Sequence, residues 1–463
     1  MASCVIAQKP LERTLPIGQQ VMFTVSNDSI VASSYKVKFV AEVRVSDTAI
    51  NPNVATDLIG TFKTTPNNKG VGMFDLRAIL ETFIKPDNEP SKWGSFKGIT
   101  ANTKMFPIHL IDKYSQSYNS IKFFQVRFLV EYAASPTGLV GDPAHKVDSN
   151  EYLMFNGVLQ YDDILNLSMF GDYGYLLNSF ELTDTDSHFL SNAPTTQYAR
   201  LEDYGTLPFL DYEPLSTNTV DSITVTYYKA DGSPTAGVSD TITNTTGTGG
   251  SSNSLGSNTR LIYFGAFPAN LQNWSSNFAL AMADDLAYYT VQAFKGVLPI
   301  SKIYTINILC DINKGYAPIR LTWLNQWGTW DYYTFNMKST KSVKTKRISY
   351  TQLEGTWNES IFKISDYKGG KKNFRVNSTE SIKINTDFVS EAESEWFEEL
   401  MNSTEVYIIS GFSADTYNTI TNKYIEPITV KTSSYIRKTM ANDRLIQYTF
   451  EIDKTRVKRT QAV

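Results

Sequence analysis

The stretch Ile319-Arg-Leu-Thr-Trp-Leu-Asn-Gln-Trp-Gly-Thr-Trp-Asp-Tyr-Tyr-Thr-Phe335 decides the fold class of this chain. Side chains alternate between two faces with the period of two that is typical of β-strands, and Asn325-Gln-Trp-Gly328 suits a tight turn between them. The stretch therefore predicts a β-hairpin. Aromatic residues on both faces of its second strand indicate that one face meets the domain core and the other a second domain or subunit.

We expect the aromatic side chains of this hairpin to form the buried centre of an interface between subunits. These side chains are Trp323, Trp327, Trp330, Tyr332, Tyr333 and Phe335. The alternative is a glycan-binding β-sandwich module, in which Trp323, Trp327 and Trp330 would stack on sugar rings. The glycan-binding hypothesis predicts exposed tryptophans in an isolated chain, whereas the interface hypothesis predicts tryptophans buried between copies.

Composition also favours a β-rich globular protein. The 463 residues predict about three domains. Hydrophobic residues make up 41% of the chain and charged residues only 19%, which excludes a disordered protein. The 27 Tyr and 26 Phe favour strands, and the many Ser and Asn favour turns. A net charge of -4 excludes general polyanion binding by charge alone.

Cysteine and histidine usage predicts neither a disulfide framework nor a metal centre. Cys4 and Cys310 are too few for a disulfide scaffold and fit folding in a reducing cytoplasm. His109, His145 and His188 lie far apart and lack metal-ligand spacing. We find no secretory signal and no apolar run of the length that a membrane-spanning helix needs.

The expected fold is mainly β and multi-domain, with two β-sandwich-like domains and a small C-terminal α+β unit. The predicted segments are an N-terminal arm (1–15), a β-sandwich with a short helix (16–135), an extended irregular connector (136–215), a second β-sandwich (216–345) that holds the long polar loop 231–258 and the aromatic hairpin 319–335, and the C-terminal α+β unit with a basic tail (346–463). The polar loop is expected to be a mobile hairpin tip, and the alternative is an ordered loop that binds a partner. In this last unit, an apolar stripe predicts a helix over Thr386–Met401, capped by Thr386 or Ser390.

Three groups of acidic residues could carry chemistry, and each has a simpler explanation. Asp184-Thr-Asp-Ser-His188 could be a metal or acid–base site, but a polar turn is favoured. Asp311-Ile-Asn-Lys-Gly315 resembles part of a calcium loop, but its glycine falls one position early and no glutamate stands at the twelfth position. The cluster Glu391, Glu393, Glu395, Glu398 and Glu399 fits a solvated helix face better than paired catalytic carboxylates.

No nucleotide-binding, nucleophile-elbow or zinc-protease motif is found, so we expect no enzyme, no catalytic residues, no metal and no cofactor. The alternative is a tail-associated glycan depolymerase, for which Asp184, Asp186 and Asp331 are the nominees.

Two basic runs could contact phosphates or an acidic partner. The first consists of Lys338, Lys341, Lys344, Lys346 and Arg347. The second consists of Arg456, Lys458 and Arg459 near the C-terminus. Phosphate contact would be sensitive to salt because it releases counterions.

Three segments resemble virion proteins of tailed phages that infect Bacteroidetes, including crAss-like phages. Gly60–Leu80 resembles their N-terminal β-domain, and Arg320–Phe335 resembles their segment Trp-x-Asn-x-x-Gly-x-x-Asp-Tyr-Tyr-x-Phe. Glu399–Tyr407, followed by Tyr424–Val430, resembles their C-terminal unit. The motifs are structural, so no active-site residues carry over from the resemblance.

The resemblance implies a structural virion protein, best a tail ring or tail-barrel subunit, made in the host cytoplasm. The expected partners are further copies of the chain in a ring, and other tail, portal or fibre proteins. Non-specific contact with packaged DNA would fall on the basic run 338–347. A capsid auxiliary or fibre-adaptor protein is the alternative component.

Overall fold

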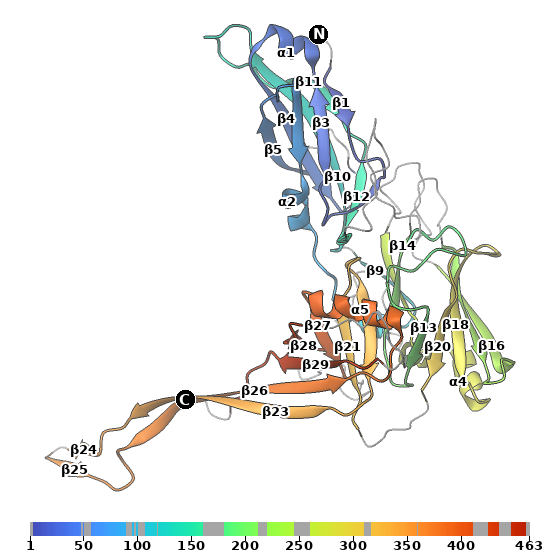
Figure 1. Cartoon of the computed structure of the whole chain (residues 1–463), viewed down its shortest axis with the longest axis vertical. Coiled ribbons are helices and arrows are strands. Elements are labelled where there is room, and N and C mark those ends of the chain that lie inside the picture. The colour runs from blue at the N-terminus through green and yellow to red at the C-terminus, as the bar shows by residue number, and fades with distance from the viewer. Residues whose placement is uncertain are drawn as a thin grey trace. The chain divides into compact units, whose positions relative to one another are not determined.

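The computed structural model describes residues 3–47, 50, 57–88, 95–96, 99–100, 107–117, 119–160, 180–211, 220–244, 260–309, 316–358, 360–410, 425–434 and 446–459. The chain is mainly β, with several antiparallel sheets and short helices, as predicted (Figure 1). It forms two compact units. Unit 1 comprises Met1–Asp311, Leu324–Asp331 and Ser413–Thr419, and unit 2 comprises Ile312–Trp323, Tyr332–Phe412 and Ile420–Val463.

The N-terminal part of unit 1 contains two sheets. In spatial order, the larger sheet consists of β2 (Thr14–Pro16), β12 (Tyr152–Phe155), β10 (Ile121–Ala133), β4 (Tyr35–Ser46) and β5 (Leu58–Thr64), with β11 (Ala144–Asp148) beside β10. The smaller sheet consists of β1 (Val5–Gln8), β3 (Met22–Ser26) and β6 (Val71–Asp75). Shorter elements are α1 (Asp28–Ser33), α2 (Arg77–Leu80), the 3-10 helices η2 (Glu81–Phe83) and η3 (Ile108–Leu110), β7 (Ser95–Phe96) and β8 (Ile99–Thr100).

A sandwich-like core joins these two sheets. Alternate residues of β10 are buried, as expected for a strand with one face toward a core. The ring of Phe23 in β3 lies 5.4 Å from that of Phe128 in β10 and 5.7 Å from that of Tyr152 in β12. The aromatic residues of the two sheets therefore pack together, which supports the β-sandwich predicted in this part of the chain.

The C-terminal part of unit 1 has its own pair of sheets. One consists of β13 (Thr196–Ala199), β20 (Tyr304–Ile308), β18 (Tyr288–Lys295), β15 (Ser222–Tyr228) and β16 (Pro234–Thr243), with β19 (Leu298–Pro299) beside β18. The other consists of β14 (Thr206–Asp211), β17 (Arg260–Gly265) and β9 (Tyr114–Ser117), and the helices are α3 (Pro268–Gln272) and α4 (Ser276–Ala283). The buried Tyr114 hydroxyl donates to Ile242 O at 2.7 Å and accepts from Ile223 N at 3.2 Å.

Two predictions about irregular segments were wrong. The expected connector 136–215 contains β11 and β12 of the first part of unit 1 and β13 and β14 of the second. The expected polar loop 231–258 contains β16, which pairs with β15 at the end of its sheet. An edge strand needs only its backbone and one buried face, so a low-complexity sequence can form one. Residues 161–179, 212–219 and 245–259 lie outside the described residues.

A seven-stranded sheet and one helix form the centre of unit 2. In spatial order, the sheet consists of β22 (Trp330–Phe335), β21 (Ile319–Leu324), β27 (Val406–Ile409), β28 (Ile425–Val430), β29 (Thr449–Lys454), β26 (Lys371–Asn385) and β23 (Thr340–Thr351). The helix is α5 (Glu391–Asn402), and a small hairpin consists of β24 (Gly355–Asn358) and β25 (Ile361–Ile364).

Helix α5 begins at Glu391, five residues after the predicted start, and its N-cap is Ser390, one of the two predicted caps. The Ser390 side chain accepts from Glu393 N, and the Glu393 side chain accepts from Ser390 N, which forms a capping box. Trp396, Phe397 and Leu400 are buried, as the apolar stripe predicts. Phe388 was predicted on this stripe but precedes the helix and is 55% exposed.

The predicted boundary between residues 345 and 346 was also wrong. The hairpin strands β21 and β22 join the C-terminal sheet, because β21 pairs with β27 from Arg320–Ile409 to Trp323–Val406. The second predicted sandwich therefore ends before the hairpin. Strand pairing over such a distance in sequence leaves no local signal in the alternation of either strand.

Candidate functional site

The tryptophans of the hairpin are buried within the single chain. Trp323, Trp327 and Trp330 are 0%, 2% and 0% exposed. In unit 2, the Trp323 ring lies 4.8 Å from that of Trp396 on α5. In unit 1, Trp330 Nε1 donates to Asp87 O at 2.8 Å.

These contacts correct the role predicted for the hairpin. Tyr332 and Phe335 are 4% and 1% exposed, and the half-buried Tyr333 packs its ring 4.8 Å from Phe397. The hairpin aromatics are therefore core residues, and the prediction that they fill an interface between copies was wrong in its location. A glycan-stacking platform at Trp323, Trp327 and Trp330 is contradicted for the same reason.

A buried polar network fixes the hairpin turn. Asn325 Oδ1 accepts from the backbone N–H groups of Trp327 (3.0 Å) and Thr329 (3.1 Å), and Asn325 Nδ2 donates to Asp331 Oδ1 at 3.0 Å. Ser191 Oγ donates to the same Asp331 oxygen at 2.6 Å. Asp331 is 2% exposed, so this nominee for glycoside hydrolysis is a structural acceptor held away from solvent.

The segment Asp184–His188 forms the polar turn that was favoured from sequence. Asp184 Oδ1 accepts from Asp186 N at 2.8 Å and from Ser187 Oγ at 3.2 Å. His188 Nε2 lies 2.8 Å from Lys302 Nζ. Burial, and then the nearby Lys302 charge, lower the pKa of His188 below its ordinary value, which keeps its imidazole neutral near pH 7.

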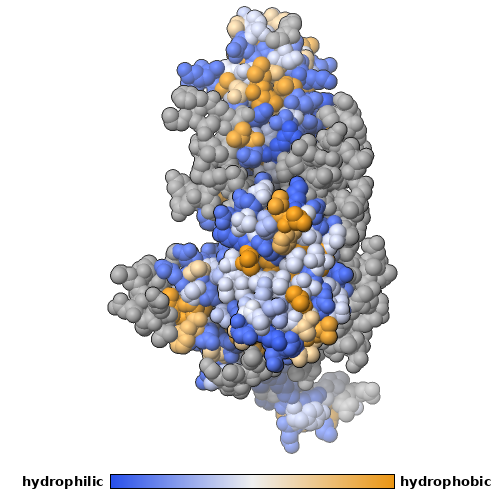
Figure 2. All heavy atoms as spheres, turned by 90° about the vertical axis from the view of Figure 1, so that its right-hand side faces the viewer, coloured by the Kyte–Doolittle hydropathy of each residue, from blue (hydrophilic) through white to orange (hydrophobic). Residues whose placement is uncertain are grey.

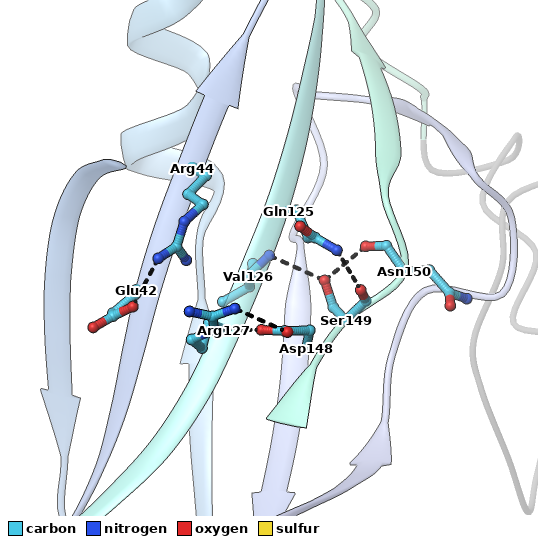
Figure 3. Close-up of polar contacts among 8 residues, drawn as sticks. All are labelled: Glu42, Arg44, Gln125, Val126, Arg127, Asp148, Ser149 and Asn150. Atoms are coloured by element: carbon cyan, nitrogen blue, oxygen red, sulfur yellow. Dashed lines mark hydrogen bonds and ion pairs between the residues drawn. The ribbon is translucent and has the colours of Figure 1, made fainter. Parts of the chain in front are cut away.

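A charged row crosses the larger sheet of unit 1 and was not predicted from sequence (Figure 3). Arg127 on β10 donates twice to Asp148 on β11, at 2.6 and 3.1 Å. Its partner on the adjacent strand β4 is Glu42, which forms an ion pair with Arg44 of the same strand at 2.9 Å. The hydrogen bond to Asp148 raises the pKa of Arg127. Opposite charges on adjacent strands stabilise their pairing, which gives this row a structural role.

The described residues contain no group of three or more His, Cys, Asp or Glu placed to hold a metal ion. The calcium-loop fragment Asp311–Gly315 lies outside the described residues. Within the part of the chain that is described, no helix combines the length and apolar character that a bilayer crossing needs.

Among the described residues, the most distinctive surface is a two-stranded ribbon in unit 2, formed by β23 and the outer part of β26. Figure 1 shows the two strands running side by side away from the rest of their sheet toward the β24–β25 hairpin. Every residue of β23 is exposed. The two strands pair from Thr340–Lys383 to Thr351–Lys371, with one irregularity after Ile348. We call residues 340–376 the ribbon.

The ribbon carries an unusual density of exposed apolar side chains. Eleven of the large apolar residues that are exposed in the described chain lie between Val343 and Val376, and they include Trp357 (67%) and Tyr367 (75%). On the face shown in Figure 2, by contrast, the visible hydrophobic patches are small and separated by hydrophilic residues. Concentrated exposed apolar surface marks an interaction site.

The basic run predicted from sequence lies on or beside this ribbon. Lys341, Lys344, Lys346 and Arg347 are on β23, and Lys338 lies just before it; all five are exposed. None of the ion pairs of the described residues involves Lys346 or Arg347. Lys346 and Arg347 are therefore accessible to solvent, and contact with an anionic partner stays a prediction.

Two residues of the second basic run contact the part of β26 that directly follows the ribbon. Lys458 Nζ lies 2.8 Å from Glu380 Oε2 on β26, and Arg459 Nε donates to Asn377 Oδ1 at 2.7 Å. Lys458 and Ser378 also exchange two backbone hydrogen bonds of 3.0 Å. Lys458 and Arg459 thus have intramolecular roles that sequence reasoning did not predict.

Comparison with protein-family models and with curated protein sequences found no match to this chain.

Proposed function

We propose that this chain is a structural subunit of a tailed-phage virion, most simply a tail ring or tail-barrel protein that assembles through protein–protein interfaces. The observation that carries the proposal is the ribbon. An isolated two-stranded hairpin is marginally stable in water, and this one exposes aromatic and aliphatic residues along its length. Such an element becomes stable when a neighbouring protein packs against it and buries its exposed apolar side chains.

The sequence resemblance supports the virion assignment. Its three segments coincide with β5–β6 of unit 1, the hairpin β21–β22, and the strands β27 and β28 of unit 2. Buried packing explains why most of the aromatic residues of the second segment are needed. The ribbon, which lies outside the resemblance, supplies an external surface for assembly.

The test is the mass of the purified chain in solution across concentration and salt, followed by negative-stain electron microscopy of any large species. We expect a closed ring, or a monomer that joins a ring when tail partner proteins are added. A chain that remains monomeric with every tail partner, and that binds or cleaves a host glycan, would refute the structural assignment.

A further inference from the structure

The charge of the chain is divided unevenly between the ribbon and the rest. Residues 340–376 contain nine Lys or Arg and three Asp or Glu, a net charge of +6. Because the whole chain carries -4, the remainder carries -10. The ribbon is thus a basic element on an acidic protein.

One face of the ribbon combines basic and apolar side chains. Residues directly opposite each other in an antiparallel pair share a face, and so do alternate residues of one strand. By this rule Lys344, Lys346, Ile348 and Tyr350 of β23 share a face, joined by Arg375 opposite Ile348 and Lys372 opposite Tyr350. Ile348 and Tyr350 are 48% and 45% exposed, so the basic charges surround accessible apolar surface.

Among the described residues, the surface whose charge best complements the basic ribbon is the acidic segment around α5. Residues 386–405 contain seven Asp or Glu and no Lys or Arg. Glu391 and Glu395 are exposed, and Phe388, at 55% exposure, lies just before the helix. This acidic surface offers carboxylates and one exposed aromatic ring, as a basic and apolar partner would require.

We infer that the basic face of the ribbon docks on the acidic α5 surface of a second copy of this chain. This inference rests on the proposed function, because it names the partner through which the subunits assemble. Two ribbons do not pair with each other, since both carry +6. The ribbon does not fold back on its own α5 either, because every residue of β23 is exposed.

A ribbon on one copy and a helix on the next make a heterologous contact, which repeats around a ring or along a filament.

Duplex DNA is the competing anionic partner. The aliphatic side chains Val343, Ile348, Leu353, Ile361 and Ile364 argue against it, because they cannot pair with the phosphates that supply most of the affinity for DNA. The -10 charge of the remainder would also repel DNA.

Charge reversal tests this contact on the full-length chain. One variant carries Lys344→Glu and Lys346→Glu on the ribbon, and the other carries Glu391→Lys and Glu395→Lys on α5. The first variant lowers the charge of the ribbon from +6 to +2, and the second changes that of residues 386–405 from -7 to -3. We expect each variant alone to lose at least about tenfold in self-association constant, because the attraction between the two surfaces is weakened and like charges replace opposite charges at the reversed positions. A 1:1 mixture of the two variants regains association, since each retains the surface that the other lacks. Circular dichroism confirms that each variant is folded.

The matched control reverses two exposed lysines outside the ribbon, Lys69→Glu and Lys85→Glu, which changes the net charge equally. The control self-associates like the unaltered chain. Assembly that persists in both surface variants overturns the ribbon–α5 contact while leaving the proposed function intact. An unaltered chain that stays monomeric, even with tail proteins, overturns both. Tight binding of a duplex DNA probe that the ribbon variant abolishes, without self-association, replaces the second copy by nucleic acid.

Discussion

Replacing Trp323 by alanine tests whether the hairpin aromatics belong to the core of one chain. The side chain is 0% exposed and packs against Trp396 at 4.8 Å and Phe397 at 6.4 Å between ring centroids. Burying an aromatic side chain removes about 150–250 Å² from water, which at about 25 cal/mol per Å² is about 4–6 kcal/mol. Alanine keeps part of this burial, and large-to-small core changes of this kind cost about 3–5 kcal/mol.

The matched control is Trp357→Ala, the same substitution at a site that is 67% exposed on the ribbon. It should change stability by less than about 0.5 kcal/mol. Differential scanning calorimetry at low protein concentration is the assay. For a unit of this size about 3 °C corresponds to 1 kcal/mol, so Trp323→Ala should lower the unit 2 transition by about 9–15 °C.

The two variants together separate a core residue from an interface residue. If Trp323→Ala left the melting transition of the dilute chain unchanged and weakened only its self-association, the intramolecular packing argument would be refuted. The interpretation of the hairpin as an interface between copies would then be correct.

Three further substitutions test local features. Gly328→Ala should destabilise unit 1 by at least about 2 kcal/mol in urea unfolding, because φ is 71° and a Cβ would lie 1.9 Å from Asn156 O. Ser390→Ala should cost about 1 kcal/mol and speed amide hydrogen exchange in the first turn of α5, because the capping box is lost. Lys302→Met should raise the pKa of His188 in an NMR titration, although burial keeps it below 6.5. In the unaltered chain the unfolded state binds the His188 proton more tightly, so stability falls as pH drops below about 6.5; in the variant this loss should be smaller.

Local patterns predicted the elements of this fold well. The alternation in Tyr35–Ser46 and Ile121–Ala133 predicted two long strands, because one face of each is buried. The stripe at Trp396, Phe397 and Leu400 predicted α5, and Ser390 was one of two predicted caps. These features depend on residues close together in sequence, which is why periodicity reveals them.

Long-range pairing was not predictable in the same way. The partner of β21 is β27, more than 80 residues later, and nothing in either strand identifies the other. For this reason the hairpin was assigned to the wrong unit. The prediction that both aromatic faces of the second hairpin strand are covered was correct, but the elements that cover them belong to the same chain. Composition cannot tell whether such a face packs against its own chain or against another subunit.

The sequence predicted the charge of the ribbon but not its structure. The lysines of residues 338–347 were identified as a partner-binding run, but not as one strand of a long hairpin. The strand lacks an apolar face of the usual kind, because all twelve residues of β23 are exposed. A signal was present in Gly369-Gly370, where φ is 84° and 70°, conformations suited to a turn before β26.

The lysines of β23 have a consequence for the solubility of the free subunit. This strand ends its sheet and presents a row of unpaired backbone groups, the usual template for fibril-like aggregation. Charged side chains on such an edge oppose stacking of like strands, since each added copy brings the same charge. The same lysines thus protect the free subunit from aggregation through this edge strand before it binds its neighbour. Neutralising them would favour precipitation, whereas reversing their sign preserves the protection and changes only the choice of partner.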